Sequence, residues 1–194
     1  MRLGSIVKAA ASSVALASLL LAAGPAAAQV MGPDPIPIGP ITLGSPNDPP
    51  HIVFGAGAFD VLTNKNHPDS QTAGEVRGEY RFGDVLSIIS PFIGASVTTK
   101  GGTYEYAGFG FDINITPNWV LNPNFAVGNY GPGSGTKLGS SIEFRSGLEL
   151  DYRFWDQSRA GIAVQHMSNA GISRHNTGEE SITLIYAIPL PGWP

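Results

Sequence analysis

The chain has 194 residues, of which 42% are hydrophobic and only 13% are charged, and its formal net charge is −4. This apolar content with so little charge excludes an ordinary disordered chain. The absence of cysteine excludes a disulfide scaffold, a thiolate metal site and a cysteine nucleophile. The acidic balance gives no indication of nucleic-acid binding. Twenty-five glycines are poorly suited to helix interiors and favour β-structure.

Residues 1–28 have the features of a secretory signal peptide. Arg2 and Lys8 supply the positive start, and residues 9–23 form an apolar run of signal length. Three alanines at 26–28 provide the small residues that precede a cleavage site. The alternative is a membrane-anchoring helix, which this short, alanine-rich run does not favour. We therefore expect a mature chain that begins at Gln29.

Residues 29–50 form a proline-rich segment. Proline lacks a backbone N–H and fixes φ, so we expect neither a central strand nor a helix here, but an extended chain like polyproline II. A passive leader is the favoured interpretation, and peptide recognition is the alternative. The prolines are Pro33, Pro35, Pro37, Pro40, Pro46, Pro49 and Pro50.

From residue 51 onward, apolar and polar residues alternate with the period of two that is typical of strands. No later window holds the run of apolar residues that a spanning helix needs. The alternation predicts eight strands, at residues 51–62, 72–83, 88–99, 103–115, 119–130, 138–155, 158–169 and 179–190. The segment 138–155 is longer than the others and is expected to protrude.

The links between these segments are alternately short and long, with the tight turn at Lys100 as the least regular, and bacterial outer-membrane barrels have short turns at one end and longer loops at the other. Charged residues of both signs share one parity and would pair inside a narrow barrel. We therefore predict an all-β fold, an eight-stranded antiparallel transmembrane β-barrel of the bacterial outer membrane, over residues 51–194. A soluble antiparallel sandwich is the alternative. The expected outward residues are Tyr80, Phe109, Phe144 and Leu150, and the expected inward residues are Arg77, Glu79, Asp112 and Glu143.

Polar residues interrupt the apolar row on the last two segments. On the seventh, Ala160, Ile162 and Val164 are followed on the same face by His166 and Ser168, and on the eighth the row begins with Glu180. A hairpin centred near residue 174 would place Ser168 opposite Glu180, with His166 diagonal to it. Serine, histidine and a carboxylate together can form a hydrolytic triad. The alternative is that these residues mark only the membrane–water interface.

The stretch His-Met-Ser-Asn-Ala-Gly at residues 166–171, followed by Asn176 and Glu180, resembles the signature of PagL-type lipid A 3-O-deacylases. This resemblance implies an eight-stranded outer-membrane esterase that hydrolyses the 3-O-linked acyl chain of lipid A. It implies that Ser168, His166 and Glu180 form the triad, that Asn169 or Asn176 supports the oxyanion, and that no cofactor or metal is needed.

The neighbouring Glu179 has the opposite parity and is expected to point into the barrel. The expected partners are lipid A, or lipopolysaccharide, and outer-membrane lipid, with no nucleic acid, and whether the barrel forms a homodimer stays open. A non-catalytic adhesin or structural barrel is the alternative function, and a soluble periplasmic binding sandwich is a third. A metal pair of His166 and His175 is disfavoured because no third ligand is evident.

Overall fold

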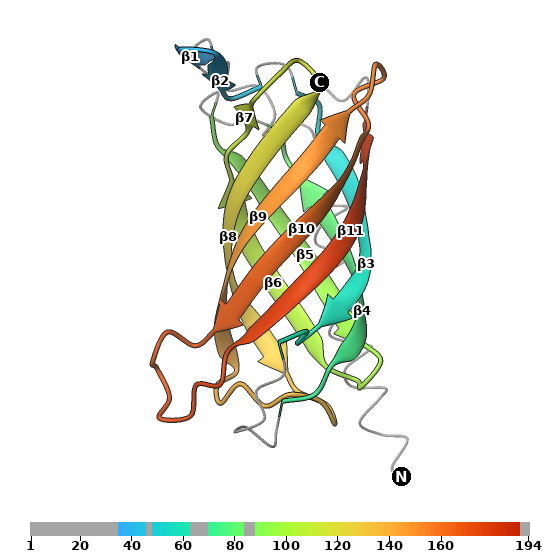
Figure 1. Ribbon diagram of the computed structural model, residues 1–194. Coiled ribbons are helices and arrows are strands. Elements are labelled where there is room, and N and C mark those ends of the chain that lie inside the picture. The colour runs from blue at the N-terminus through green and yellow to red at the C-terminus, as the bar shows by residue number, and fades with distance from the viewer. Residues whose placement is uncertain (1–34, 46–47, 63–69, 84–87, 191–194) are drawn as a thin grey trace.

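The computed structural model describes residues 35–45, 48–62, 70–83 and 88–190 (Figure 1). The predicted signal peptide lies outside these ranges, and so does part of the proline-rich segment. Among the described residues, no helix is long and apolar enough to cross a membrane.

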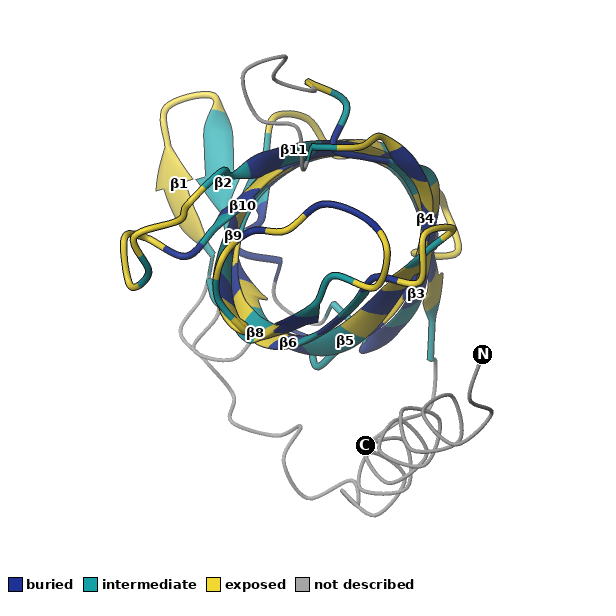
Figure 2. Cartoon of the chain, turned by 90° about the horizontal axis from the view of Figure 1, so that it is seen from below, coloured by how far each residue is buried: buried dark blue, intermediate teal, exposed yellow. Residues whose placement is uncertain are grey.

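Eight long antiparallel strands close into a barrel, as the alternation predicts (Figures 1 and 2). Each long strand pairs with the next one along the chain, and pairing of the last with the first closes the ring. The soluble sandwich is therefore excluded. The strands are β3 (His51–Phe59), β4 (Ala73–Arg81), β5 (Ser90–Thr98), β6 (Thr103–Gly110), β8 (Trp119–Gly131), β9 (Ile142–Arg153), β10 (Arg159–Ser168) and β11 (Glu179–Pro189).

Two of the predicted segments are divided differently in the structure. The segment 103–115 breaks into β6 and the short β7 (Ile113–Asn114), because Asp112 turns into the lumen and accepts a hydrogen bond from Asn122 at 2.8 Å. The predicted protruding strand 138–155 is also wrong at its start, since β9 begins only at Ile142. Leu138 is buried and Gly139 has φ of 101°, so the chain before Ile142 leaves the extended conformation.

The described part of the proline-rich segment is more regular than the expected polyproline-like chain. It forms a hairpin of β1 (Ile36–Ile38) and β2 (Ile41–Leu43), and β2 pairs with β7. Pro37 is accommodated because β1 is an edge strand, where a missing N–H breaks no ladder. The hairpin stands beside the barrel wall in Figure 2. We call this end of the barrel, where β3 begins and β11 finishes, the terminal end.

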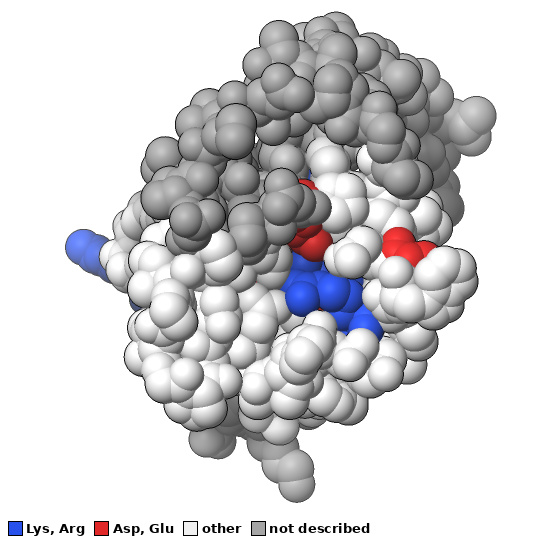
Figure 3. Space-filling model, turned by 90° about the horizontal axis from the view of Figure 1, so that it is seen from above, with Lys and Arg blue, Asp and Glu red and all other residues white. Residues whose placement is uncertain are grey.

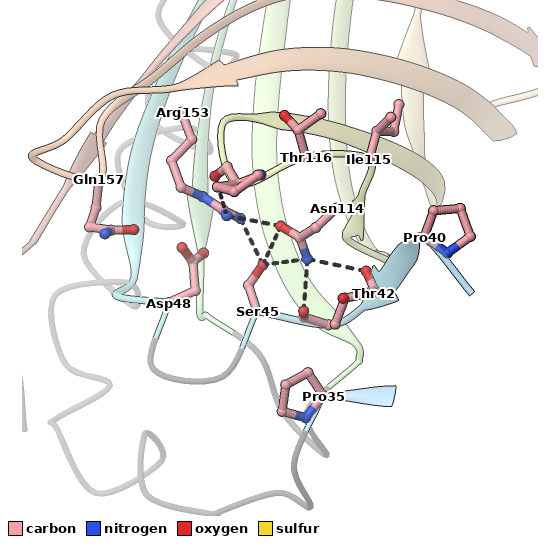
Figure 4. Close-up of a pocket in the computed structure, with 12 residues that line it drawn as sticks. Pro35, Pro40, Thr42, Ser45, Asp48, Asn114, Ile115, Thr116, Arg153 and Gln157 are labelled. Carbon is pink, nitrogen blue, oxygen red and sulfur yellow. Dashed lines mark hydrogen bonds between the residues drawn. The ribbon is translucent and has the colours of Figure 1, made fainter. Parts of the chain in front are cut away.

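Ser45 and Asp48, which follow the hairpin, contact side chains at the barrel mouth of the terminal end. There the Arg153 guanidinium donates to Ser45 Oγ at 2.7 Å and to Asn114 Oδ1 at 2.9 Å (Figure 4). Asp48 forms an ion pair with Arg159 at 2.8 Å. Figure 3 views the molecule onto this end and shows basic and acidic side chains side by side at the mouth, surrounded mainly by uncharged atoms among the described residues. These contacts tie the segment that follows the hairpin to the barrel mouth, and a pocket of about 610 Å³ remains beside the hairpin.

The side chains separate by parity as the sequence predicts. Arg77, Glu79, Asp112 and Glu143 are all buried inside the barrel. Phe109 and Leu150 are exposed on the outer wall, and Tyr80 and Phe144 are partly exposed on the same surface. An apolar exterior around a charged interior is the arrangement that a barrel needs in a bilayer.

The interior charges form a bonded network across the lumen. Arg81 contacts Glu149 at 2.7 Å and Glu79 at 3.0 Å, and Arg145 reaches the same Glu79 at 3.1 Å. The Arg145 guanidinium also lies 4.0 Å from the centre of the Tyr106 ring. Because these side chains fill the lumen, a molecule that binds the barrel must reach it from outside the wall.

Candidate active site

The three predicted triad residues lie on the outer wall at the end opposite the terminal end. We call this the loop end, because it carries the loops of residues 132–141 and 169–178. His166 and Ser168 lie in the last three residues of β10, and Glu180 is the second residue of β11. His166 Nδ1 and Glu180 Oε1 are 3.2 Å apart, within hydrogen-bonding distance. Their side chains are 49% and 41% exposed, so this pair is accessible from outside the barrel.

The register of the β10–β11 hairpin differs from the predicted one by two residues, so the same side chains still face outward. His166 lies directly opposite Glu180, and Met167 lies opposite Glu179. Ser168 is therefore diagonal to Glu180, whereas the predicted hairpin placed those two residues directly opposite each other. The hairpin is centred on residue 173 rather than near 174, because the loop residues after Ser168 are arranged by contacts that strand parity does not specify.

Ser168 is half-buried and follows His166 on the same face of β10. Gly178 directly precedes β11, and its lack of a side chain leaves space for the imidazole of His166. A Cβ atom at residue 178 would lie 3.0 Å from His166 Cε1 and 3.8 Å from Nε2. The edge of the His166 imidazole that lies away from Glu180 therefore points toward the end of the strand at which Ser168 lies. Within residues 88–190, which are described without a gap, no hydrogen bond joins Ser168 to His166.

Asn169 organises the loop rather than facing the outer wall. Its side chain is fully buried, and its Nδ2 donates to Leu138 O at 2.9 Å and to His175 O at 2.8 Å. Its Oδ1 accepts from Gly171 N at 3.0 Å. The Asn169 backbone N–H donates to Asn176 Oδ1 at 3.1 Å, which leaves the exposed Asn176 with its amide N–H₂ group for other contacts.

Residues of the neighbouring loop hold this segment in place, and the sequence analysis did not single them out. Thr177 Oγ1 donates to Lys137 O at 2.7 Å, and His175 Nε2 lies 3.2 Å from the same oxygen. Gly139 approaches the His175 carbonyl so closely that any side chain at 139 would collide with it. Gly139 and Gly178 both have positive φ, and glycine at these two positions is a sequence signal for this packing.

Glu179 points into the barrel, as its parity predicts. Its side chain is buried, and its Oε2 accepts a hydrogen bond from Asp60 N at 3.1 Å. Asp60 in turn accepts from Thr136 Oγ1 at 2.6 Å and Ser70 Oγ at 2.7 Å. Glu179 therefore belongs to an interior cluster that joins three segments at the loop end, and only Glu180 is available to His166.

A groove of about 460 Å³ runs along the outer wall from the His166–Glu180 pair toward the middle of the barrel. Its outward polar side chains lie at the loop end, where Val61 and Leu62 flank them, and its other apolar side chains lie farther along the strands. The groove therefore fits a molecule with a polar head and an apolar tail. The outward-facing residues that line it are Ser146 and Leu148 of β9, Val164 and His166 of β10, and Glu180 and Ile182 of β11, beside Val61 and Leu62.

The fold and this lateral site define a class of protein, the small membrane-type β-barrel with polar groups on its outer wall. Among solved structures, the chain is similar to the crystal structure of the outer membrane enzyme PagL, with a TM-score of 0.54 and 18% identity over 72% of this chain and 99% of that one. A second likeness is to a de novo designed transmembrane β-barrel, with a TM-score of 0.51 and 11% identity over 74% of this chain and 98% of that one. At these identities both show the fold.

Sequence comparison leads to a particular family. Residues 103–189 match the family model described as lipid A 3-O-deacylase (PagL). The chain is also 37% identical over 92 residues to the lipid A deacylase PagL of Pseudomonas aeruginosa, a match that covers 45% of this chain and 48% of that protein. The chain thus spans about half the length of the curated relative it matches. The similarity to the PagL family lies in residues 103–189, which run from β6 to β11.

Proposed function

We propose that the protein is an esterase of the outer membrane that removes the 3-O-linked acyl chain of lipid A, with Ser168, His166 and Glu180 as its catalytic triad. The single observation that carries the proposal is the His166–Glu180 pair at 3.2 Å on the outer wall, with Ser168 next on the same face. The match of residues 103–189 to the lipid A 3-O-deacylase family model supports the reaction, and so does the similarity to a lipid A deacylase.

In this mechanism Glu180 accepts a hydrogen bond from His166 Nδ1–H and so leaves Nε2 as the basic nitrogen. Nε2 removes the proton of Ser168 Oγ as that oxygen attacks the ester carbonyl carbon. The resulting tetrahedral intermediate collapses, the sugar oxygen leaves with the proton from His166, and an acyl-enzyme remains. Water, activated by the same imidazole, then releases the fatty acid and restores Ser168.

The oxyanion needs donors close to Ser168, and the contacts of the loop distinguish the candidates. Both N–H bonds of the Asn169 amide donate within the protein, so its side chain serves to shape the loop. The backbone N–H groups of Asn169 and Gly171 also donate within the loop. Among the described residues no acceptor faces the Ala170 N–H, and the Asn176 Nδ2 group is likewise available. We assign the oxyanion to these two donors.

The position of the site fits a lipid substrate that stays in its membrane. The groove opens sideways on the apolar outer wall, and Leu148, Val164 and Ile182 offer an apolar path for an acyl chain below the ester. With the terminal end in the periplasm, the loop end lies at the outer leaflet, where lipopolysaccharide resides. A lateral triad at that height meets an ester bond without extraction of the lipid.

The test is mass spectrometry of lipopolysaccharide incubated in detergent with the purified protein. We expect the loss of one 3-linked hydroxyacyl chain with the wild type and no loss with Ser168→Ala. Ser141→Ala is the matched control, since Ser141 is exposed before β9 and outside the groove. A wild type that folds but releases no acyl chain would contradict the proposal and favour a non-catalytic barrel.

A further inference from the structure

Ser146 is the one aliphatic hydroxyl in the outward row of β9, and both of its neighbours in that row are apolar. The outward positions of that strand are Ile142, Phe144, Ser146, Leu148, Leu150 and Tyr152. A polar group that faces hydrocarbon costs free energy unless it finds a partner. Ser146 is exposed, and among the described residues its hydroxyl makes no hydrogen bond within the protein. Its partner must therefore come from outside the chain.

The register places Ser146 beside the catalytic pair. Ser146 lies directly opposite His166, on the side away from Glu180, and Ser168 lies opposite Phe144. Ser146 and Ser168 are thus diagonal neighbours on adjoining strands, about 7–8 Å apart by Cα. Ser146, His166 and Glu180 supply the outward polar side chains of the groove, and the apolar path of Leu148, Val164 and Ile182 begins at the next outward position of each strand.

An acyl chain that enters the groove from the ester must pass this polar row. When Ser168 attacks the carbonyl carbon, the next carbons of the chain lie between Ser168 and the level of Ser146. Glu180 is engaged by His166, and His166 must face Ser168 to act as a base. Ser146 is therefore the group on this row that is free to bind a polar substituent close to the ester, such as a hydroxyl on the third carbon of the acyl chain.

We propose that Ser146 is a specificity-determining residue, which hydrogen-bonds the 3-hydroxyl of the departing acyl chain and selects 3-hydroxyacyl esters over unsubstituted ones. This inference rests on the proposed function, because it takes Ser168 as the nucleophile. A single neutral hydrogen bond in a partly exposed groove predicts a preference of about three- to tenfold in kcat/KM. A chain without the hydroxyl leaves Ser146 facing hydrocarbon with no partner.

The test uses two synthetic glucosamine 3-O-esters of equal chain length, one with a 3-hydroxyacyl chain and one with a plain acyl chain, presented in detergent micelles. The wild type is expected to prefer the hydroxylated ester, and Ser146→Ala is expected to lose most of that preference through a lower rate on the hydroxylated ester. Ser146→Thr, which keeps the hydroxyl, should retain it. Leu148→Ala, a control in the same groove, should slow both esters alike.

A preference that persists in Ser146→Ala, or an equal loss on both esters, would overturn this role. Binding of the same two esters to the Ser168→Ala protein separates the inference from the proposed function. Tighter binding of the hydroxylated ester, abolished by Ser146→Ala, would support the role of Ser146 even if the wild type hydrolysed neither ester. Equal binding of both esters together with no hydrolysis would contradict both proposals.

Discussion

Two groups of polar side chains lie at opposite ends of the barrel, and they differ in burial and in bonding. At the terminal end, Asp112 and Asp48 both contact Arg159, at 2.7 and 2.8 Å, and the exposure of these three side chains is at most 6%. At the loop end, His166 and Glu180 are 49% and 41% exposed and share a single contact of 3.2 Å.

The difference separates groups that stabilise the fold from groups that are available to a substrate. A buried charge needs a partner, because the interior solvates it poorly. The terminal-end residues satisfy that need within the chain, and Asp48 fastens the segment that follows the N-terminal hairpin to the barrel mouth. The outer-wall residues leave donors and acceptors open toward lipid, an arrangement that costs free energy unless a ligand uses them. Substitutions in the two groups should therefore affect different measurements.

The largest expected effect follows removal of the nucleophile or its base. Ser168→Ala and His166→Ala should each lower the deacylation rate by about 10⁴-fold or more, and the double variant should lose no more than the single ones, because both residues serve one step. The measurement is release of the 3-linked acyl chain from lipopolysaccharide in detergent. Multiplied losses in the double variant would show that the residues act separately.

Substitution of the two adjacent glutamates should lower activity in one case and mainly stability in the other. Glu180→Ala should lower the rate by about 10³- to 10⁴-fold, because the imidazole loses the carboxylate that holds its orientation. Glu179→Ala should leave a much higher rate and instead weaken the loop end, since it removes the acceptor of Asp60 N. Rates and urea unfolding of both variants in micelles test this. Equal rate losses would mean that Glu179 also serves His166.

At the terminal end the expected effect is on stability. Arg159→Ala should lower the free energy of unfolding by about 3–5 kcal/mol, because it leaves Asp112 and Asp48 buried without their shared cation. Arg174→Ala is the matched control, since Arg174 is exposed in the loop 169–178. Unfolding in urea measures the difference. A stability unchanged by Arg159→Ala would show that the charged contacts at the mouth contribute little.

The smallest expected effect tests the space around the imidazole. Gly178→Ala would place a Cβ 3.0 Å from His166 Cε1 at a residue with φ of +66°, and should reduce activity by about tenfold through a displaced ring. Gly171→Ala provides a close control, because Gly171 has φ of +82° but no atom within 4 Å of the new Cβ. If both variants lost activity equally, backbone strain would explain the loss and contact with the imidazole would not.

Strand parity was sufficient to predict much of the molecule from the sequence. The alternation in residues 72–82 and 142–154 separates inward charges from outward aromatics, and burial in the structure confirms that separation. The same rule predicted that Glu180 faces outward and Glu179 inward. These predictions succeed because a strand's period of two is local and needs no knowledge of distant segments. Where side-chain contacts interrupt the alternation, as at Asp112, the predicted strand ends were wrong.

Only the tertiary structure decided how the loop end is built. The hairpin register, the role of Asn169 within the loop and the contacts of Lys137, Leu138 and Gly139 depend on a second loop far away in the sequence. The position of Ser146 beside His166 likewise comes from pairing of β9 with β10. Such contacts result from barrel closure and loop packing, which bring together residues from different strands and loops. The local pattern of one strand therefore cannot specify them.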